Sequence, residues 1–288
     1  MSALPIAVGV ALLLVAAFAG VYGRRQHRRS ALVRNTETTD VWDVREEGRV
    51  ELKGTVRADE PFDSPIRGDP AVLSAWEVEE WDERGDSEMW ETRAEGVYAT
   101  PFALDDGTGR VTVDVGDHVD DVSSGTGVHE IQVGPIDVDR LAGVGVSADD
   151  VLAVLDDFAV GVSVPPDADP PERVADFVRG EAGLAEQRDS ITNVLDFGTA
   201  HGERRYYEGV LAPDDDVYVL GHARATEGAT HPLKPEDVVV TPRESFIVSD
   251  MPESELADAF GTYRYAYVGA ALAAVVGLGA LAVGLGVV

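Results

Sequence analysis

Two uncharged apolar segments, one at each end of the chain, constrain the fold more than any other feature. The first covers residues 4–22 and the second residues 265–288, and neither contains a charged side chain. A helix rises about 1.5 Å per residue, so even the shorter segment covers roughly 29 Å, close to the thickness of a bilayer's hydrocarbon core. Apolar residues surround both predicted helices instead of forming one stripe. The sequence therefore predicts a body held to the cell membrane by a transmembrane helix at each end.

A cleaved signal peptide is the alternative explanation of the first segment, because residues 17–19 resemble an A-x-A cleavage site. A signal peptide carries positive charge before its apolar run. In this chain the three residues before the run are uncharged, and four arginines follow it instead. An uncleaved anchor is therefore the favoured interpretation.

The basic residues beside the two segments predict the sidedness of the chain. Arginines next to a membrane span stay in the cytoplasm, which places the central body there and both termini outside. Tyrosines at the apolar boundaries are typical of side chains at headgroup level. The four arginines after the first segment also attract anionic lipid headgroups, by about 1 kcal/mol each. This predicted topology rests on Tyr22, Arg24, Arg25, Arg28, Arg29, Arg264, Tyr265 and Tyr267.

The second apolar segment contains small residues four positions apart, a spacing that lets helices approach closely. Gly269 is paired in this way with Ala273, Ala273 with Gly277, and Ala280 with Gly284. The pattern indicates helix–helix self-association. A general richness in glycine and alanine produces the same pattern, so both interpretations stay open.

The body between the two segments is strongly acidic. Residues 30–264 contain all 53 acidic residues and 19 of the 23 basic ones, a net charge of −34. Apolar strand-like runs recur throughout, so the body is predicted to be folded and not a disordered acidic tail. The charge then indicates a protein adapted to molar salt, because such salt screens repulsion between charges more than about 3 Å apart. A phosphate backbone requires a basic surface, so the composition predicts no nucleic-acid partner.

The sequence contains no recognisable catalytic motif, neither a phosphate-binding loop nor a nucleophile elbow nor a paired-histidine zinc motif. The absence of cysteine excludes disulfides, iron–sulfur clusters and thiolate zinc sites. Acidic turns at residues 105–107 and 214–216 offer oxygen ligands for Ca²⁺ or Mg²⁺, but such turns are also expected from the composition alone. The six histidines are irregularly spaced. We therefore predict no catalytic residue, no cofactor and no metal site.

Alternating apolar residues predict that the body is mainly β. An Asp-Gly turn at residues 106–107 predicts one hairpin, and many short strands are typical of a barrel or a sandwich. Three tryptophans, Trp76, Trp81 and Trp90, form either a ligand groove or a core residue with exposed edge aromatics. The predicted strands cover residues 50–57, 71–82, an arm from 90, 96–104, 110–115, 128–133, 205–211, 217–223, 238–241 and 245–248.

Helical spacing interrupts this β pattern. Residues 149–158 and 170–181 have helical periodicity, the second with Asp169 as N-cap and three apolar residues directed inward, and residues 252–262 form a further predicted helix opened by Asp250. The fold class is therefore a membrane-anchored α+β protein, mainly β, with a compact barrel-like or sandwich-like domain. Its predicted parts are a transmembrane helix at 4–22, a basic connector at 24–44, the domain at 45–262 with a helical insert near 149–190, and a transmembrane helix at 265–288.

Five phrases, in order along the chain, resemble one family. They are PFDSPIRG at 61–68, WEVEEW at 76–81, TPFALDDGTGRVTV at 100–113, YYEGVLAPDDDVYVL at 206–220 and FIVSDMPESEL at 246–256. With the flanking apolar segments they resemble the GIDE domain, also called the "beside a membrane" (BAM) domain, over roughly residues 45–285. This domain is the body of membrane-anchored E3 ubiquitin ligases of the mitochondrial outer membrane.

The resemblance implies a zinc-binding RING finger after the second span, built from cysteine and histidine ligands. The sequence contains no cysteine and ends within the second segment, so we expect no counterpart of the RING. In the ligases the body faces the intermembrane space, whereas the arginines here favour the cytoplasm. The predicted function is a non-catalytic membrane protein whose GIDE-like domain binds or organises an unknown protein partner at the bilayer. The alternative is an E3 ubiquitin transferase, on the family resemblance alone.

Overall fold

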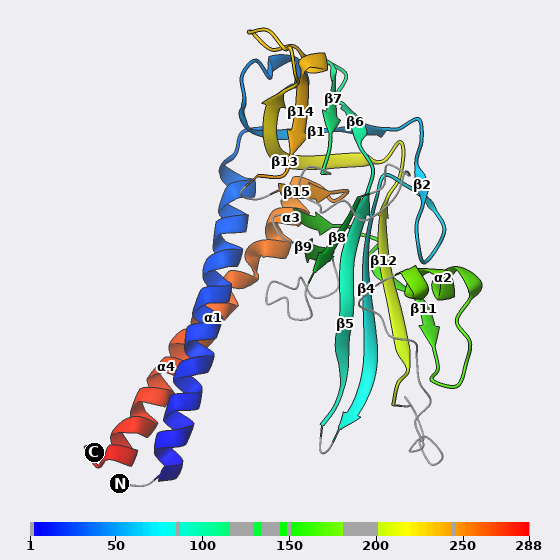
Figure 1. Ribbon diagram of the computed structural model, residues 1–288. Helices are drawn as coiled ribbons and strands as arrows, with labels where there is room; N and C mark the ends of the chain where they lie inside the picture. The colour runs from blue at the N-terminus through cyan, green and yellow to red at the C-terminus, as the bar shows by residue number, and fades with distance from the viewer. Residues whose placement is uncertain are drawn as a thin grey trace. The chain divides into compact units, whose positions relative to one another are not determined.

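The computed structural model describes residues 3–84, 87–115, 129–133, 145–148, 151–180, 201–243 and 246–287 (Figure 1). These residues belong to two compact units. The helical unit combines Met1–Thr36 with Glu253–Val288, and the body is Glu37–Pro252. The chain is mixed in secondary structure and mainly β, as the sequence predicts.

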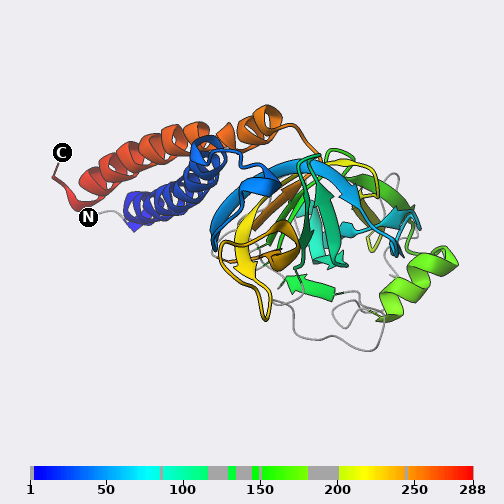
Figure 2. The same cartoon turned by 90° about the horizontal axis from the view of Figure 1, so that it is seen from above.

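The helical unit is an antiparallel helix pair (Figures 1 and 2). Helix α1 covers Ala3–Asn35, and α4 covers Tyr263–Leu285. Helix α3, Glu253–Ala259, and a 3₁₀ turn at Phe260–Thr262 lead directly into α4. The predicted helix over residues 252–262 is therefore confirmed, and it runs into the last apolar segment.

The predicted basic connector is largely helical. Residues 24–35 continue α1, because they contain good helix formers such as arginine, glutamine, alanine and leucine, and no glycine or proline. Beyond Asn35, Thr38 forms an isolated bridge with Glu51, and a single 3₁₀ turn covers Val41–Asp43. Asp40 precedes that turn without a capping hydrogen bond from its side chain. The boundary between the units also moves residues 253–262 from the predicted domain to the helical unit.

A closed five-stranded barrel forms one part of the body. Its strand order is β1–β6–β7–β14–β13, and β13 pairs back with β1. The sequence left a barrel and a sandwich open, and this part of the body is a barrel. The predicted Asp-Gly hairpin joins β6 to β7. The strands are β1 Gly48–Arg57, β6 Phe102–Asp105, β7 Arg110–Val113, β13 Asp216–Ala225 and β14 Val238–Thr241.

Strand β13 also carries the sheet beyond the barrel, in the order β13–β15–β10–β9. These strands are β15 Phe246–Ser249, β10 Val151–Val154 and β9 Gly145–Ala148. Gly221 lies where the neighbour of β13 changes from β15 to β14. A Cβ there would lie 2.6 Å from Cγ1 of Val240, so the close approach requires glycine.

Residues 151–154 form strand β10 and not the predicted helix over 149–158. All four residues are buried, and β10 pairs with β15 on one side and β9 on the other. A strand covered on both faces is apolar at every position, so its sequence matches a buried helix equally well. Residues 149–150 lie outside the described residues.

The second large sheet has the order β11–β12–β4–β5–β8. Strands β4 and β5 form the long hairpin predicted around the tryptophans, with Trp81 opposite Trp90. Residues 96–99 belong to β5 and not to the predicted strand 96–104, because Thr100 and Pro101 separate β5 from β6. The bounds are β4 Leu73–Arg84, β5 Ser87–Ala99, β8 His129–Val133, β11 Ala159–Val164 and β12 Arg204–Leu211.

Helix α2, Glu172–Gly180, follows β11 and buries three apolar residues as predicted, namely Val174, Phe177 and Val178. It begins two residues later than predicted, so its N-cap is Pro171 and not Asp169. Trp76 packs edge-on against Phe177 at 4.9 Å between ring centroids and is almost fully buried. Trp76 is therefore a core residue, which favours the core explanation of the tryptophans over a groove. The rest of the predicted insert, residues 181–190, lies outside the described residues. The remaining short elements are the strand pair β2 Phe62–Asp63 and β3 Pro70–Ala71 and a 3₁₀ turn at Pro235–Asp237.

Candidate functional site

Glycines bring α1 and α4 into backbone contact. A Cβ on Gly9 would lie 2.8 Å from the carbonyl oxygen of Gly277, and a Cβ on Gly277 would lie 3.0 Å from the carbonyl oxygen of Gly9. About two turns further along α4, a Cβ on Gly284 would lie 2.6 Å from Cγ1 of Ile6 and 3.0 Å from its backbone nitrogen. Small residues are what allow apolar helices to approach this closely.

This contact uses part of the small-residue pattern that predicts self-association. Gly277 and Gly284 are buried against α1, whereas Gly269 is exposed with open space around it. Packing within the chain therefore accounts for two of these glycines without a second copy. Self-association through the outward side of α4 stays a prediction.

The residues predicted to mark the membrane boundary gather around one level of the helix pair. A Cβ on Gly23 would lie 3.2 Å from the Tyr267 ring, and the His27 and Tyr263 rings lie 4.7 Å apart. The guanidinium of Arg264 lies over the Tyr263 ring, at 5.8 Å from its centroid. The exposed members of the predicted set are Arg24, Arg25, Arg28, Arg264, Tyr265 and Tyr267, while Tyr22 and Arg29 are partly buried.

The outward surface of the helix pair is apolar. Two segments of the described chain, Ala3–Asn35 and Glu253–Leu285, are long and apolar enough to cross a membrane. Their exposed large apolar side chains include Leu4, Val8, Val10, Leu14, Val15, Phe18 and Val21 on α1, and Val268, Leu272, Val275, Val276, Leu278, Val283 and Leu285 on α4.

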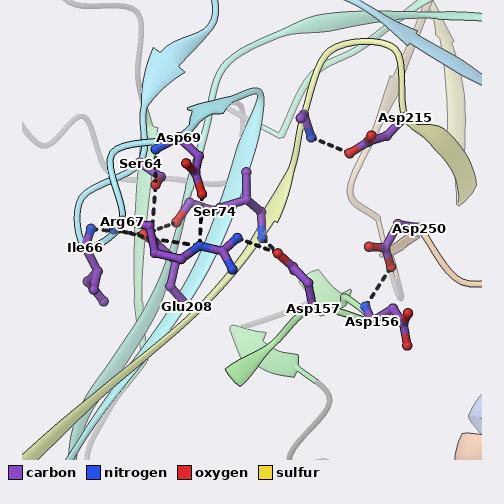
Figure 3. A network of polar contacts seen from close by, with 12 residues as sticks. Ser64, Ile66, Arg67, Asp69, Ser74, Asp156, Asp157, Glu208, Asp215 and Asp250 are labelled. Atoms are coloured by element: carbon purple, nitrogen blue, oxygen red, sulfur yellow. Dashed lines mark hydrogen bonds and ion pairs between the residues drawn. The ribbon is translucent and has the colours of Figure 1, made fainter. Parts of the chain in front are cut away.

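In the body, Glu208 on β12 is an acidic side chain at the centre of a polar network (Figure 3). It is fully buried and accepts four hydrogen bonds. Two come from the hydroxyls of Ser64 and Ser74, at 3.0 and 2.9 Å. Two come from the backbone N–H groups of Ile66 and Arg67, at 3.1 and 2.7 Å. An ionised carboxylate has about four acceptor positions, so Glu208 is saturated and holds residues 64–67 against β12 and β4.

Arg67 supplies the positive charge beside this carboxylate. Its Nε lies 3.8 Å from Glu208 Oε2 and 3.1 Å from Asp69 Oδ2, and its terminal nitrogen pairs with Asp157. Burial lowers the pKa of Arg67, but the hydrogen bond to Asp157 and the negative charges of Asp157, Glu208 and Asp69 outweigh it and raise the pKa. Arg67 therefore remains charged and neutralises the buried acidic group.

A cavity of about 420 Å³ opens beside this network. Its polar groups already have partners, since Asp157 accepts from the Val210 N–H at 3.1 Å and Asp215 from the Ala212 N–H at 2.8 Å. The lining thus holds the backbone in place and offers no nucleophile beside a general base. The lining residues are Arg67, Asp69, Pro70, Asp157, Val210, Ala212, Pro213 and Asp215.

Asp250 lies at the edge of the same network, directly after β15. Its carboxylate accepts a hydrogen bond from the Asp156 N–H at 2.8 Å (Figure 3). Burial raises the pKa of Asp250 to about 6. The hydrogen bond from the Asp156 N–H lowers this pKa, whereas the negative charges of Asp157 and Asp156 raise it further. Asp250 therefore changes charge close to neutral pH.

This shift predicts a pH-dependent stability. The pKa of Asp250 is higher in the folded chain than in the unfolded one, so the folded chain binds the proton more tightly. The contribution of Asp250 to the free energy of unfolding is therefore greatest below about pH 4, and this contribution is lost as the pH rises through about 6. Asp250→Asn keeps an oxygen for the Asp156 N–H, and we expect it to stabilise the protein at pH 7 by about 1 kcal/mol after allowance for solvent screening.

Urea unfolding at pH 7 and pH 4.5 measures this difference, which we expect to shrink at the lower pH. Asp59→Asn, at an exposed position of the body, is the matched control. An equal gain for Asp250→Asn at both pH values would contradict the assignment.

The acidic turns considered as ion sites are occupied by contacts of their own. Asp106 accepts hydrogen bonds from the N–H groups of Val41, Thr108 and Gly109 at 2.7, 2.8 and 3.0 Å. Asp214 pairs with Arg57. Among the described residues no group of three or more histidine and acidic side chains is placed to hold a metal ion.

Four of the five phrases that resemble the GIDE domain contribute residues to the Glu208 network or lie next to it. Residues 61–68 supply three of the four donors to Glu208, which itself belongs to the phrase at 206–220. Trp76, in the phrase at 76–81, lies opposite Glu208 in the β4–β12 pair. Asp250, in the phrase at 246–256, bonds to Asp156 beside Asp157. The remaining phrase, at 100–113, lies on the β6–β7 hairpin of the barrel.

No protein-family model, no curated protein and no solved structure matches the chain. The GIDE resemblance therefore stays a prediction, and the function has to be argued from the two units themselves.

Two structural features were not identified from the sequence. One is the buried carboxylate of Glu208. The sequence contains a signal for it, because Arg204, Tyr206 and Glu208 occupy every second position of β12 and therefore lie on the same buried face. The other is the α1–α4 contact at Gly9, for which the signal was a small residue every seven positions in α1, at residues 9, 16, 23 and 30. A seven-residue repeat keeps one side of a helix on its neighbour.

Proposed function

We propose that the helix pair crosses a bilayer twice and anchors a non-catalytic body that binds a protein partner at the membrane surface. The observation that carries this proposal is the exposed apolar surface of α1 and α4. An apolar patch that extends over residues 4–21 of α1 and 268–285 of α4 is costly in water, whereas hydrocarbon accepts it. No charged side chain lies in residues 3–23 or 265–287. The body is proposed to face the cytoplasm, with both termini outside.

A pair of reporter fusions tests the insertion and its sidedness. A reporter after Val288 is expected to be extracytoplasmic, and one inserted near Pro166, in the loop between β11 and α2, is expected to be cytoplasmic, because the arginines next to the spans stay in the cytoplasm. Reporter activity and protease protection in intact cells give the two readouts. The opposite pattern would reverse the proposed topology, and a chain released by alkaline carbonate would refute the anchor.

The body is proposed to be a GIDE-like domain. The support is that four of the five resembling phrases meet around Glu208 and Arg67, although the two within residues 61–81 are far in the chain from the two within residues 206–256. A network whose groups are all engaged favours a rigid binding scaffold over a reaction centre. The strongest candidate for the binding surface is β11, the outer strand of the second sheet.

Strand β11 has the properties of an edge that accepts another strand. Among the strands that the structure describes, only β12 pairs with it. Its first three residues are exposed, including Val160 at 44%, and its sequence AVGVSV contains no charge. Natural sheets protect such edges with charged residues or proline. An uncharged edge is suited to bind an extended segment of a partner by backbone hydrogen bonds.

Photo-crosslinking in native membranes tests this surface. A photoreactive residue at position 160 is expected to give one or a few discrete adducts in molar salt, because a bound strand would lie alongside the edge. The control position is Glu227, which is exposed in the turn after β13. Adducts of equal yield at both positions, or none at position 160, would count against partner binding at β11.

A further inference from the structure

We propose that Arg24 and Arg28 together bind the phosphate of an anionic phospholipid headgroup, an inference that rests on the proposed insertion of the helix pair. Arg24 and Arg28 are both exposed and are four residues apart on α1. Side chains at this spacing are neighbours on a helix surface. The pair therefore presents two guanidinium groups to one ligand.

The pair lies on the side of α1 that is turned away from its packing partners. Gly23, Gln26 and Ser30 are the buried residues in this part of α1. At 100° per residue, Arg24 and Arg28 point roughly opposite to the average of those three directions. The two guanidinium groups thus face the surroundings of the helix pair and not its interior.

Arg24 and Arg28 also lack a counter-charge of their own. Within the described part of the chain no acidic side chain pairs with either of them, whereas Arg34, further along the same helix, pairs with Asp258 at 3.4 Å. Arg25 and Arg29 each take part in an interaction within the chain. From residue 259 to residue 288 the chain contains no acidic residue, so α4 has none to offer. Two like charges four residues apart repel, and a bound anion removes that repulsion.

The depth of the pair matches a headgroup. Arg24 lies two residues past Tyr22 and Arg28 six residues past it, about 3 and 9 Å along the helix axis. The headgroup layer on each side of a bilayer is about 5–8 Å thick, so Arg24 lies within it, and Arg28, at its outer edge, reaches it with its long side chain. Because α1 continues unbroken to Asn35, the two side chains are held at that depth by a rigid helix and not by a loose linker.

The residue type selects the ligand. A guanidinium binds phosphate oxygens through two parallel N–H donors, which a lysine ammonium cannot do. Direct hydrogen bonds of this kind persist in molar salt, where diffuse attraction between a basic segment and a charged surface is screened within about 3 Å. A phospholipid with a net negative headgroup fits this site better than a zwitterionic one, whose own ammonium offsets the phosphate charge.

The test uses the full-length protein reconstituted in phosphatidylcholine vesicles with trace spin-labelled lipid. The fraction of label immobilised by the protein is compared for phosphatidylglycerol and phosphatidylcholine. We expect phosphatidylglycerol to be preferred by at least about fivefold in the unmodified protein, because each arginine near the surface contributes about 1 kcal/mol, a factor of about five. The preference is expected to disappear in Arg24→Gln/Arg28→Gln. Arg28→Gln alone should reduce it, while Arg34→Gln, the same charge loss on the same helix beyond the headgroup layer, should leave it unchanged.

Three outcomes would overturn the proposal, and they are distinguishable. If no lipid is immobilised, the chain is not in the bilayer, and the proposed function fails with it. If both lipids are immobilised equally, the anchor stands and the headgroup site fails. If 10 mM inorganic phosphate abolishes the preference, the site takes free phosphate and not a lipid.

Discussion

Replacement of Glu208 by alanine is expected to lower the free energy of unfolding of the body by about 4 kcal/mol or more, a large share of the stability of an ordinary domain. The change removes the acceptor of four buried donors at once, and each unsatisfied donor costs about 1–3 kcal/mol. The hydroxyls of Ser64 and Ser74 can rotate to other acceptors. The N–H groups of Ile66 and Arg67 are fixed by the backbone and lose their partner.

Glu208→Gln separates the role of the charge from the role of the shape. The amide oxygen still accepts hydrogen bonds, but the amide nitrogen cannot accept from a backbone N–H, so we expect about half of the loss. Urea unfolding of the full-length protein in detergent, followed by tryptophan fluorescence, measures both variants. All four tryptophans, at positions 42, 76, 81 and 90, lie in the body, so the signal reports that unit alone.

Glu227→Ala is the matched control, because Glu227 is an exposed glutamate of the same unit. Its effect is expected to stay within about 0.5 kcal/mol. Unfolding midpoints that coincide for Glu208→Ala and Glu227→Ala would show that the network does not hold the body together.

The parts of the fold that were predicted correctly are those whose periodicity has one explanation. Helix α2 has one apolar face, and its three buried residues, Val174, Phe177 and Val178, were identified from that spacing. The β6–β7 hairpin follows from its Asp-Gly turn. Both signals are local, because they depend on residues within a single turn or a single element.

The parts that were missed depend on neighbours distant in sequence. Strand β10 is apolar at all four positions because β15 and β9 flank it and both its faces are covered, and nothing within residues 151–154 reveals that. The sequence predicted that the first helix ends with the apolar segment, at residue 22. In the structure only the solvent preference changes after residue 22, while the helix propensity continues to Asn35.

The candidate site could be predicted only in outline. The residues predicted to mark a membrane boundary follow from composition, because charge and aromatic content change there. The Glu208 network could not, since its donors lie about 140 residues away from their acceptor, at Ser64 and Ile66. The sequence supplied the phrases, but only the pairing of β12 with β4 brings them together.

The second prediction with a large effect concerns the helix pair. Gly277→Leu is expected to separate α1 from α4, because even a Cβ at this position lies 3.0 Å from the Gly9 carbonyl oxygen and 3.1 Å from Cβ of Leu12. Backbone cannot move aside as the end of a flexible side chain can, so the two helices must part. We expect a loss of about 3 kcal/mol of packing, at the upper end of the cost of overpacking. Gly279→Leu, two residues away with open space around it, is the matched control.

An engineered cysteine pair measures this separation directly, because the chain has no cysteine of its own. A Cβ on Gly284 lies 2.6 Å from Cγ1 of Ile6, so Ile6→Cys/Gly284→Cys places two thiols within reach of a disulfide. On oxidation in membranes we expect a cross-linked monomer, with a yield reduced severalfold by Gly277→Leu and unchanged by Gly279→Leu. A cross-linked dimer would instead show that these glycines serve self-association, and equal yields in both leucine variants would show that the glycine contact does not hold α1 against α4.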